Sequence, residues 1–384
     1  MTDASSERSE NMMDGAGGKV SRGIERSEME GGDPAGGAGG AGGKAPRGID
    51  IVHVGDWRWA SFHVFCPADR DALLMQVIQP VVAEVWSEGL ADQFFFIRYP
   101  EGGDHVRLRL RIAAGIDTAR ATDRAFARLR ARCAELDRAR GGTPEQRISV
   151  VPAVLELEID RYGGPRWFPC ALSFFALSSI EALRFVAAWR PEPRARQLIE
   201  ILTRLARQAI GMARTVEELR GLADYAVQSR PRMAPILARA DQMFERGGPD
   251  LTRRIREQIV AAATATAGAP GSPEAHGVHA RGLSAAVEGL EGEARWRALG
   301  SQMHMAANRL GLSPPEESYL SAILCRCLDA LGGELADLMA AAVRAGALAL
   351  DPADALDAQV AGEMHALFSR RADHVSGPAQ DGAT

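Results

Sequence analysis

The chain has 384 residues, of which 46% are hydrophobic, and a formal net charge of −5. This length suits one large domain or two ordinary ones, and the slightly acidic balance excludes a global basic field of the kind that attracts nucleic acid or anionic membranes. Lys19 and Lys44 are the only lysines, so the positive charge comes almost entirely from arginine and a single arginine is weak evidence of function.

The two ends of the chain differ in composition from the middle. Residues 1–49 contain "GGDPAGGAGGAGG" and almost no large apolar side chain, so we expect a disordered tail there and a second one over 372–384. Between them we expect one α+β domain over 50–371. Its first part, 50–165, carries an antiparallel or mixed sheet with helices, and it packs on a helical part, 166–371.

Strand and helix patterns alternate in the first part. The helical period over 68–89 follows an aspartate, ends at a glycine and contains Pro80, which we expect to kink it. A second amphipathic helix, 116–140, ends at Gly141. Strands are predicted at 59–66, 93–100, 105–112 and 148–159, the second and third forming a hairpin through "EGGD" and the last interrupted at Pro152.

After residue 165, alanine- and leucine-rich helical patterns continue to about residue 370, with a stretch over 267–282 that we expect to be flexible. We find no apolar run of membrane-spanning length and no secretion signal. The five cysteines have neither zinc-site nor redox spacing. These observations predict a cytoplasmic protein with reduced thiols.

No metal or organic cofactor is expected. His276 and His279 form an HxxH pattern, but no third ligand accompanies them. No glycine-rich phosphate loop lies between a strand and a helix, and no GxSxG nucleophile elbow is present.

The stretch "FFFIRYPEGGDHVRLRLRI" (94–112) places several arginines in predicted strands. Alternation puts His105, Arg107, Arg109 and Arg111 on one face of a strand and the apolar side chains on the other. A half-exposed strand with a charged outer face explains such a pattern without any function. However, no acidic residue is interleaved, and neighbouring guanidinium groups repel unless an anion joins them, so an anion-binding face is the alternative.

Two further places carry candidate chemistry. In "ELEIDRYGG" (156–164), Arg161 lies between a strand and a Gly-Gly turn, where it either pairs locally with Asp160 or Glu158 or serves a site. In "LGSQMHMAANRLGLSPPEE" (299–317), Ser301, His304 and Asn308 share one helix face. His304 is therefore a candidate acid or base, although a lone helical histidine is commonly a core or surface residue.

These segments, with "WRWASFHVFC…LLMQVIQPVV", "FFFIRYPEGGDHVRLRLR", "ELEIDRYGG" and "SQMHMAANRL" in this order, resemble the thiopeptide-type bacteriocin biosynthesis domain. This is the C-terminal glutamate-elimination domain of class I lantibiotic dehydratases, which also occurs free-standing. The resemblance spans about residues 50–345. It implies a lyase that expels glutamate from glutamylated Ser or Thr of a ribosomal precursor peptide and leaves dehydroalanine or dehydrobutyrine.

The resemblance also implies roles for individual residues. Arg107 and Arg109 of the RLR strand, Arg161 of RYGG and His304 of the HM helix are the expected catalytic residues. The residues expected to bind substrate are Arg98, His105, Arg111 and Asn308.

The chain is short for a full dehydratase, so the resemblance implies a separate glutamyl-tRNA-dependent glutamylation protein as partner, with the precursor peptide as substrate and no direct contact to nucleic acid. Two alternatives stay open. One is a thiopeptide pyridine synthase, which joins two dehydroalanines by a formal [4+2] aza-cycloaddition. The other is a non-catalytic scaffold that binds the precursor peptide. The oligomeric state is left open.

Overall fold

The structure is a computed structural model that describes residues 52–54, 57–67, 69–141, 147–228, 234–264, 270, 272–346 and 352–369. The described residues all belong to one compact unit. The tails expected over 1–49 and 372–384 lie outside the described residues.

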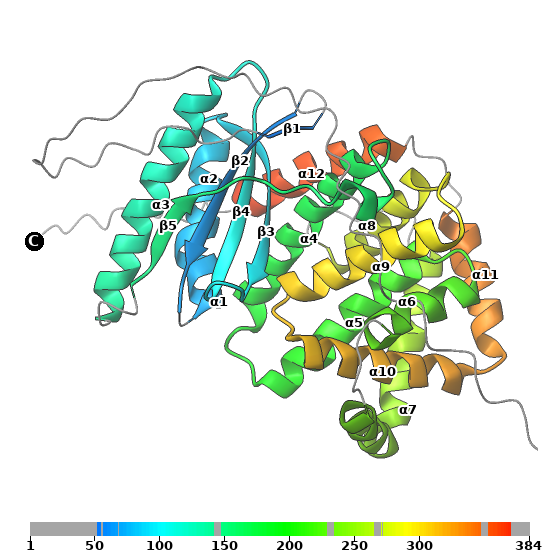
Figure 1. The fold of residues 1–384 in the computed structure, drawn as a ribbon. Helices are drawn as coiled ribbons and strands as arrows, with labels where there is room; N and C mark the ends of the chain where they lie inside the picture. The colour runs from blue at the N-terminus through cyan, green and yellow to red at the C-terminus, as the bar shows by residue number, and fades with distance from the viewer. Residues whose placement is uncertain are drawn as a thin grey trace, which may run out of the picture. The chain divides into compact units, whose positions relative to one another are not determined.

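A five-stranded antiparallel sheet forms the first part of the fold (Figure 1), which confirms the predicted α+β class. Its order is β1-β2-β4-β3, and β5 pairs with the same strand, β2, as β1 does. The predicted hairpin joins β3 to β4, and its turn contains Gly102 and Gly103 with positive φ, as tight turns require. The strands are β1 (Val52–Val54), β2 (Trp57–Phe65), β3 (Ala91–Tyr99), β4 (His105–Ile112) and β5 (Ser149–Pro152).

The two faces of the sheet have opposite character, as the alternation in β4 predicts. One face is apolar: Leu108 and Leu110 are fully buried, with Phe62 of β2 beside them. Helices α2 (Gln79–Ser87) and α3 (Thr118–Arg140) contribute to the same core on this side. The other face carries the arginines of β4, so it is free to form a polar site.

The helix predicted over 68–89 is continuous but not uniform. It begins at Asp69, whose carboxylate accepts the Ala72 N–H at 2.9 Å, and it runs as α1 (Arg70–Leu73), a π-helical turn η1 (Leu74–Ile78) and then α2. Pro80 has no N–H to donate to a preceding carbonyl, and the widened turn just before it accommodates this loss.

The strand predicted over 148–159 is shorter than expected. The ladder of β5 ends at Pro152, after which residues 153–158 are irregular and Ile159–Tyr162 form a 3₁₀ turn, η3. Proline lacks the N–H that would continue a ladder, which explains where pairing stops. The chain then crosses the polar face of the sheet toward α4, as Figure 1 shows.

Helices form the rest of the described chain, as predicted. They are α4 (Phe168–Trp189), α5 (Arg194–Met212), α6 (Val216–Gln228), α7 (Ala234–Thr264), α8 (Pro273–Ala286), α9 (Gly292–Arg309), α10 (Pro314–Leu331), α11 (Glu334–Gly346) and α12 (Pro352–Phe368). The expectation of a flexible stretch over 267–282 is wrong for its helical portion. Ser272 caps α8, and Ala280 is fully buried, so packing overrides the local glycine signal.

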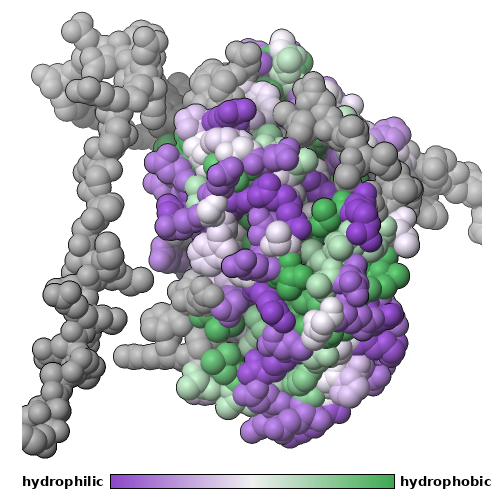
Figure 2. Space-filling model, turned by 90° about the vertical axis from the view of Figure 1, so that its right-hand side faces the viewer, coloured by the Kyte–Doolittle hydropathy of each residue, from purple (hydrophilic) through white to green (hydrophobic). Residues whose placement is uncertain are grey.

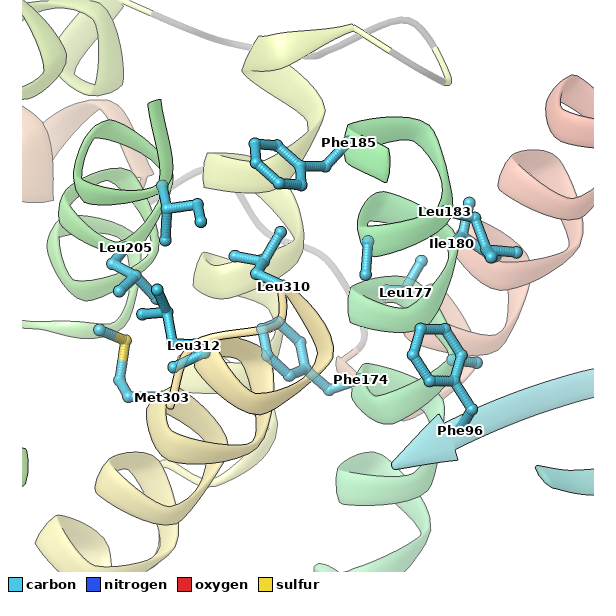
Figure 3. Close-up of a cluster of buried hydrophobic side chains, with 14 of the residues drawn as sticks. Phe96, Phe174, Leu177, Ile180, Leu183, Phe185, Leu205, Met303, Leu310 and Leu312 are labelled. Carbon is cyan, nitrogen blue, oxygen red and sulfur yellow. The ribbon is translucent and has the colours of Figure 1, made fainter. Parts of the chain in front are cut away.

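The core runs without interruption from the sheet into the helices. Figure 3 shows Phe96 of β3 beside side chains of α4. Leu205 of α5 and Met303 of α9 belong to the same core farther into the helical part. Contrary to the sequence-based expectation, one described helix, Phe168–Trp189, is long and apolar enough to span a membrane. Since 78% of its apolar window is buried inside the fold, it serves here as a core helix.

The surface of the helical part is mainly hydrophilic, with hydrophobic residues interspersed, on the face that Figure 2 shows. All five cysteines are free thiols, as the sequence predicted, and four of them are buried.

Candidate active site

A cavity of about 270 Å³ lies on the polar face of the sheet. Its walls come from β3, β4, the crossing segment after β5, and helices α4 and α9. One side is apolar, with Phe95, Phe175 and Met305 from a small core cluster separate from the main one. The polar side chains that the sequence singled out and that line it are Arg107, Arg109, Arg161, His304 and Asn308.

Arg109 is a buried cation that forms no ion pair with a described carboxylate. Its side chain is 3% exposed, and none of the described carboxylates lies within ion-pair distance of it. Its Nη1 donates to the carbonyl oxygens of Phe62 and Leu108 at 3.4 and 3.2 Å, while its Nε has no hydrogen-bond partner among the described residues. Burial, aided by the charge of Arg107, lowers the pKa of Arg109 to about 9, and the carboxylate of Glu156, which also lines the cavity, acts in the opposite direction. A ligand anion would relieve this cost.

Two neutral histidines support the arginine pair. His63 of β2 lies opposite Arg107, and burial together with the charges of Arg109 and Arg107 lowers the pKa of His63 to about 4. Its Nε2 lies 3.5 Å from Nη2 of Arg109. Burial likewise lowers the pKa of His105. Both rings are therefore uncharged near neutral pH, so they accept hydrogen bonds from the arginines without neutralising them.

Arg107 is held in place by His105 and Tyr99. The Nδ1 of His105 donates to the Gly103 carbonyl at 2.8 Å, which leaves Nε2 to accept from Arg107 Nε at 3.3 Å. The guanidinium carbon of Arg107 lies 3.5 Å from the centre of the Tyr99 ring, a cation–π contact. No described carboxylate forms an ion pair with Arg107 either. The two arginines thus bring two positive charges to one wall of the cavity without a described ion pair, and the charge of Glu156 offsets only part of that of Arg109.

Arg161 enters the cavity from η3, a different wall from that of strand β4. Its Nε donates to Ser301 Oγ of α9 at 3.0 Å, and Tyr225 of α6 lies 3.2 Å from the same oxygen. Its Nη1 pairs with Glu158 at 3.2 Å. Burial lowers the pKa of Arg161, but neighbouring Tyr162 and Glu158 outweigh it, and the pKa lies above its ordinary value. Both sequence-based alternatives for Arg161 therefore apply: it pairs locally and it lines the site.

One ring nitrogen of His304 is hydrogen-bonded to a buried carboxylate. Its Nδ1 lies 2.9 and 3.0 Å from the two oxygens of Glu317, a residue of α10 that is 5% exposed. A carboxylate only accepts, so Nδ1 is the donor and Nε2 is the nitrogen left for the cavity. This arrangement fixes the ring orientation and tautomer of a proton-transferring histidine.

Three of the predicted substrate-binding residues lie outside the cavity. Arg98 projects from the opposite face of β3 and pairs with Asp71 at 2.5 Å. His105 is buried behind Arg107. The Arg111 guanidinium donates to Asp92 at 2.6 Å and to Asp357 at 3.0 Å. The charges of Arg98 and Arg111 are thus already compensated within the protein.

Asn308 joins α9 to β3. Its side-chain oxygen accepts the Arg98 N–H at 2.9 Å, and its Nδ2 donates to the Arg98 carbonyl at 2.8 Å. Both backbone groups lie at a sheet edge that no further described strand covers. The geometry therefore suits a structural clamp that also borders the cavity.

Replacing Asn308 with alanine should lower the free energy of unfolding by about 1–3 kcal/mol, because it leaves two backbone groups unpaired at a buried edge. Chemical denaturation measures the change. Asn308→Asp keeps the acceptor but loses the Nδ2 donor and should fall between alanine and the wild type. Unchanged stability in both variants would contradict the clamp.

Sequence reasoning missed His63 and Glu317. His63 occupies an alternate position in "WRWASFHVF", on the same face as Ser61, and pairing of β2 with β4 puts it against the arginines. Glu317 stands in the first turn of α10, just after the Ser313–Glu316 capping box. Its relation to His304 depends on the packing of two helices, which the spacing of 13 residues does not reveal.

No group of three or more metal-ligating side chains occurs in the described part of the chain. Of the HxxH pattern, His279 is buried and its Nε2 lies 3.4 Å from Glu363, while the side chain of His276 lies outside the described residues.

Comparison with known proteins gives one family and a shared fold. The family model described as "Lantibiotic biosynthesis dehydratase C-term" matches residues 59–328. No curated protein sequence matches the chain significantly.

Three solved structures are similar to this chain. The tRNA-dependent lantibiotic dehydratase MibB from Microbispora sp. 107891 is 19% identical with a TM-score of 0.50, over 72% of this chain and only 28% of the MibB chain. The pyridine synthase TbtD from thiomuracin biosynthesis is 18% identical with a TM-score of 0.51, over 71% of this chain and 98% of TbtD. TsrL is 17% identical with a TM-score of 0.47, over 79% of this chain and 99% of TsrL. At these identities the first two likenesses concern the fold alone.

Proposed function

This chain belongs to the family of lantibiotic biosynthesis dehydratase C-terminal domains, and from this premise we propose that it eliminates glutamate from glutamylated Ser or Thr of a ribosomal precursor peptide. The observation that carries the proposal is the cavity itself. Two buried or half-buried arginines without carboxylate partners face it together with Arg161 and a histidine held by a carboxylate. Such a site suits an anionic substrate whose reaction needs one proton transfer.

The reaction is a β-elimination, and its requirements match the polar groups. A base removes the Cα proton of the esterified residue, the Cα–Cβ double bond forms, and the Cβ–O bond breaks so that glutamate leaves as a carboxylate. Negative charge develops first at the amide oxygen next to Cα and then on the departing carboxylate. Both charges are stabilised by fixed cationic donors.

We assign the base to His304. Its Nε2 is the nitrogen available to the cavity, and Glu317 stabilises the imidazolium that forms when the proton is taken. Arg107 and Arg109 would bind the free carboxylate that the glutamyl group retains. Arg161, on the other wall with its orientation set by Ser301, would stabilise the enolate-like oxygen or the leaving carboxylate.

The glutamyl ester must be made elsewhere in this scheme. We propose that a separate glutamyl-tRNA-dependent protein esterifies the precursor peptide and that this chain acts on the product in trans. The proposed site takes the ester and not the tRNA, which agrees with the absence of a net basic charge.

The direct test is to incubate the purified protein with a chemically glutamylated precursor peptide and to follow the peptide mass. Loss of glutamic acid to give dehydrated residues supports elimination. An unchanged mass, with the peptide retained on a column that carries the protein, would instead support the hypothesis of a non-catalytic peptide-binding scaffold. A peptide that already holds two dehydroalanines should remain unchanged; its cyclisation with loss of the leader would identify a pyridine synthase.

We expect Arg161→Ala to slow elimination by about 10²–10³-fold, the effect of removing one well-placed charge-stabilising donor. Glutamylated intermediates should then accumulate, and mass spectrometry counts them. Arg166→Ala is the matched control, because Arg166 is exposed and lies over Trp167 outside the cavity. Equal rates for the two variants would exclude Arg161 from the reaction.

A further inference from the structure

The segment between β5 and η3, residues 153–158, forms a strap that crosses the polar face of the sheet beside the cavity (Figure 1). Its first residue is tied to the sheet, because the Ala153 N–H donates to the Ser61 carbonyl at 3.0 Å. Leu155 is 7% exposed and packs with Trp59 and Phe95 in the small core cluster. The strap is therefore anchored, not loose.

The main chain of the strap has unused hydrogen-bonding groups. From Val154 to Leu157, no N–H or C=O has a hydrogen-bond partner among the described residues. The four successive residues Leu155–Glu158 all line the cavity. Side chains of an irregular, extended segment point alternately to opposite sides, so four lining residues in succession mean that the main chain itself borders the cavity.

The edge strand β3 differs from the strap, because side chains of the helices pair with its main-chain groups. On β3, the Phe96 N–H donates to Ser179 Oγ at 3.1 Å and the Phe96 carbonyl accepts from Arg309 Nε at 2.8 Å. The Arg98 N–H and carbonyl are both satisfied by Asn308. Helices α4 and α9 thus close that edge with side chains, whereas the described residues provide no such closure for the strap.

Exposed valines lie at the start of the strap, whose own Glu156 and Glu158 are also exposed, so the main chain is the part of the strap best suited to an apolar peptide contact. Val151 and Val154 are 42% and 53% exposed, and they are two of the four large hydrophobic side chains exposed in the described part of the chain. Unpaired extended backbone flanked by exposed valines is the arrangement to which a peptide adds as a further strand.

We propose that the strap is the template for the peptide substrate, which binds alongside it in an extended conformation and thereby holds the glutamylated residue at the cavity. The inference rests on the proposed function, since it concerns the peptide whose ester is cleaved. Main-chain hydrogen bonds do not depend on the identity of the side chains, so one site can process several residues of a precursor. It also requires that the residues pairing with the strap keep their N–H groups, which excludes proline there.

The first test compares synthetic substrates in the rate of glutamate release. The minimal substrate is an N-acetyl, C-methylamide glutamylserine, and the long substrate is a peptide of about eight residues, which extends beyond the strap of residues 153–158, with glutamylserine at its centre. Two further peptides carry N-methyl groups at alternate flanking residues, one set at odd and the other at even positions. In an extended peptide, only one of these sets directs its N–H groups to the strap.

We expect the long peptide to exceed the minimal substrate in kcat/KM by about tenfold or more, the effect of about two hydrogen bonds. One methylated set should lose this gain and the other should keep it. Equal behaviour of the two sets, or no gain for the long peptide, would overturn the strap proposal while the proposed function stands. No release from any of the four compounds would instead refute the elimination function.

A protein variant gives the reciprocal test. Val154→Pro removes a strap N–H, and Val154→Ala removes the same exposed side chain but keeps the N–H. Val154→Pro should lose the advantage of the long peptide and retain the rate on the minimal substrate, which also shows that the variant is folded. If Val154→Pro processes the long peptide as well as Val154→Ala does, the main chain at this position is not used.

Discussion

Replacing Arg109 with methionine should nearly abolish elimination and at the same time make the protein more stable. Methionine fills the space of the Arg109 stem but removes a charge that is buried without a carboxylate partner. Removing an uncompensated buried charge should raise the free energy of unfolding by about 1–3 kcal/mol. Losing a donor that stabilises substrate charge should cost about 10²–10³ in kcat/KM.

Arg111→Met is the matched control on the same strand and the same face. Arg111 is compensated by Asp92 and Asp357 and lies outside the cavity. Its removal leaves these partners unpaired, so stability should fall by about 1–3 kcal/mol while the rate of the folded protein stays near the wild-type value.

The two variants therefore change stability in opposite directions, and only Arg109→Met lowers activity. Thermal melting gives the first quantity, and glutamate release from a glutamylated peptide gives the second. The assignment of Arg109 to anion binding fails if Arg109→Met is less stable than the wild type and still active. In that case Arg109 would be a structural cation like Arg111.

His304→Ala should reduce elimination by about 10²–10⁴-fold, the usual contribution of a positioned general base. The glutamylated peptide should still bind, because the arginine wall of the cavity is intact. Substrate would therefore accumulate in complex with the protein, and mass spectrometry of the trapped peptide checks this. Added imidazole should restore part of the rate, which a purely structural histidine would not allow.

Glu317→Gln tests how His304 is held. Glutamine keeps the shape of Glu317 but loses the charge that stabilises the imidazolium, so the rate should fall by about tenfold or more with little change in peptide affinity. Glu316→Gln is the control, because Glu316 caps α10 at Ser313 and pairs with Arg194 at the surface. If the two variants have the same kcat, Glu317 does not act through His304.

In the proposed mechanism, the residues that bind the substrate and those that carry the chemistry come from different elements. Arg107 and Arg109 are rigid because they arise from a paired strand and are oriented by neutral histidines. Arg161 and His304 come from a 3₁₀ turn and a helix on the other side, and Ser301 and Glu317 orient them. A substrate that bridges the two walls would place its ester between a carboxylate-binding pair and a base.

The amino-acid sequence by itself determined the local structure and the separation of the sheet faces. Alternation in "HVRLRLRI" was enough to put the arginines together, and capping and glycine signals were enough to start one helix after Asp69 and to end another at Gly141. These features depend on neighbours a few residues apart, which a linear pattern records. The helix over part of 267–282 was misjudged because distant packing, not local propensity, decides it, whereas the ladder of β5 ends at Pro152, where the sequence predicted an interruption.

Only the tertiary structure decided which arginines are available to a ligand. Arg98, Arg107, Arg109 and Arg111 look alike in the sequence, yet Arg98 and Arg111 form ion pairs with Asp71, Asp92 and Asp357, whereas Arg107 and Arg109 form no ion pair with a described carboxylate. Asp357 is 246 positions from Arg111, and Ser301 is 140 positions from Arg161. Whether an arginine forms an ion pair depends on distances in space between such segments. The sequence pattern could therefore predict candidate anion-binding arginines, but not which of them form ion pairs within the protein.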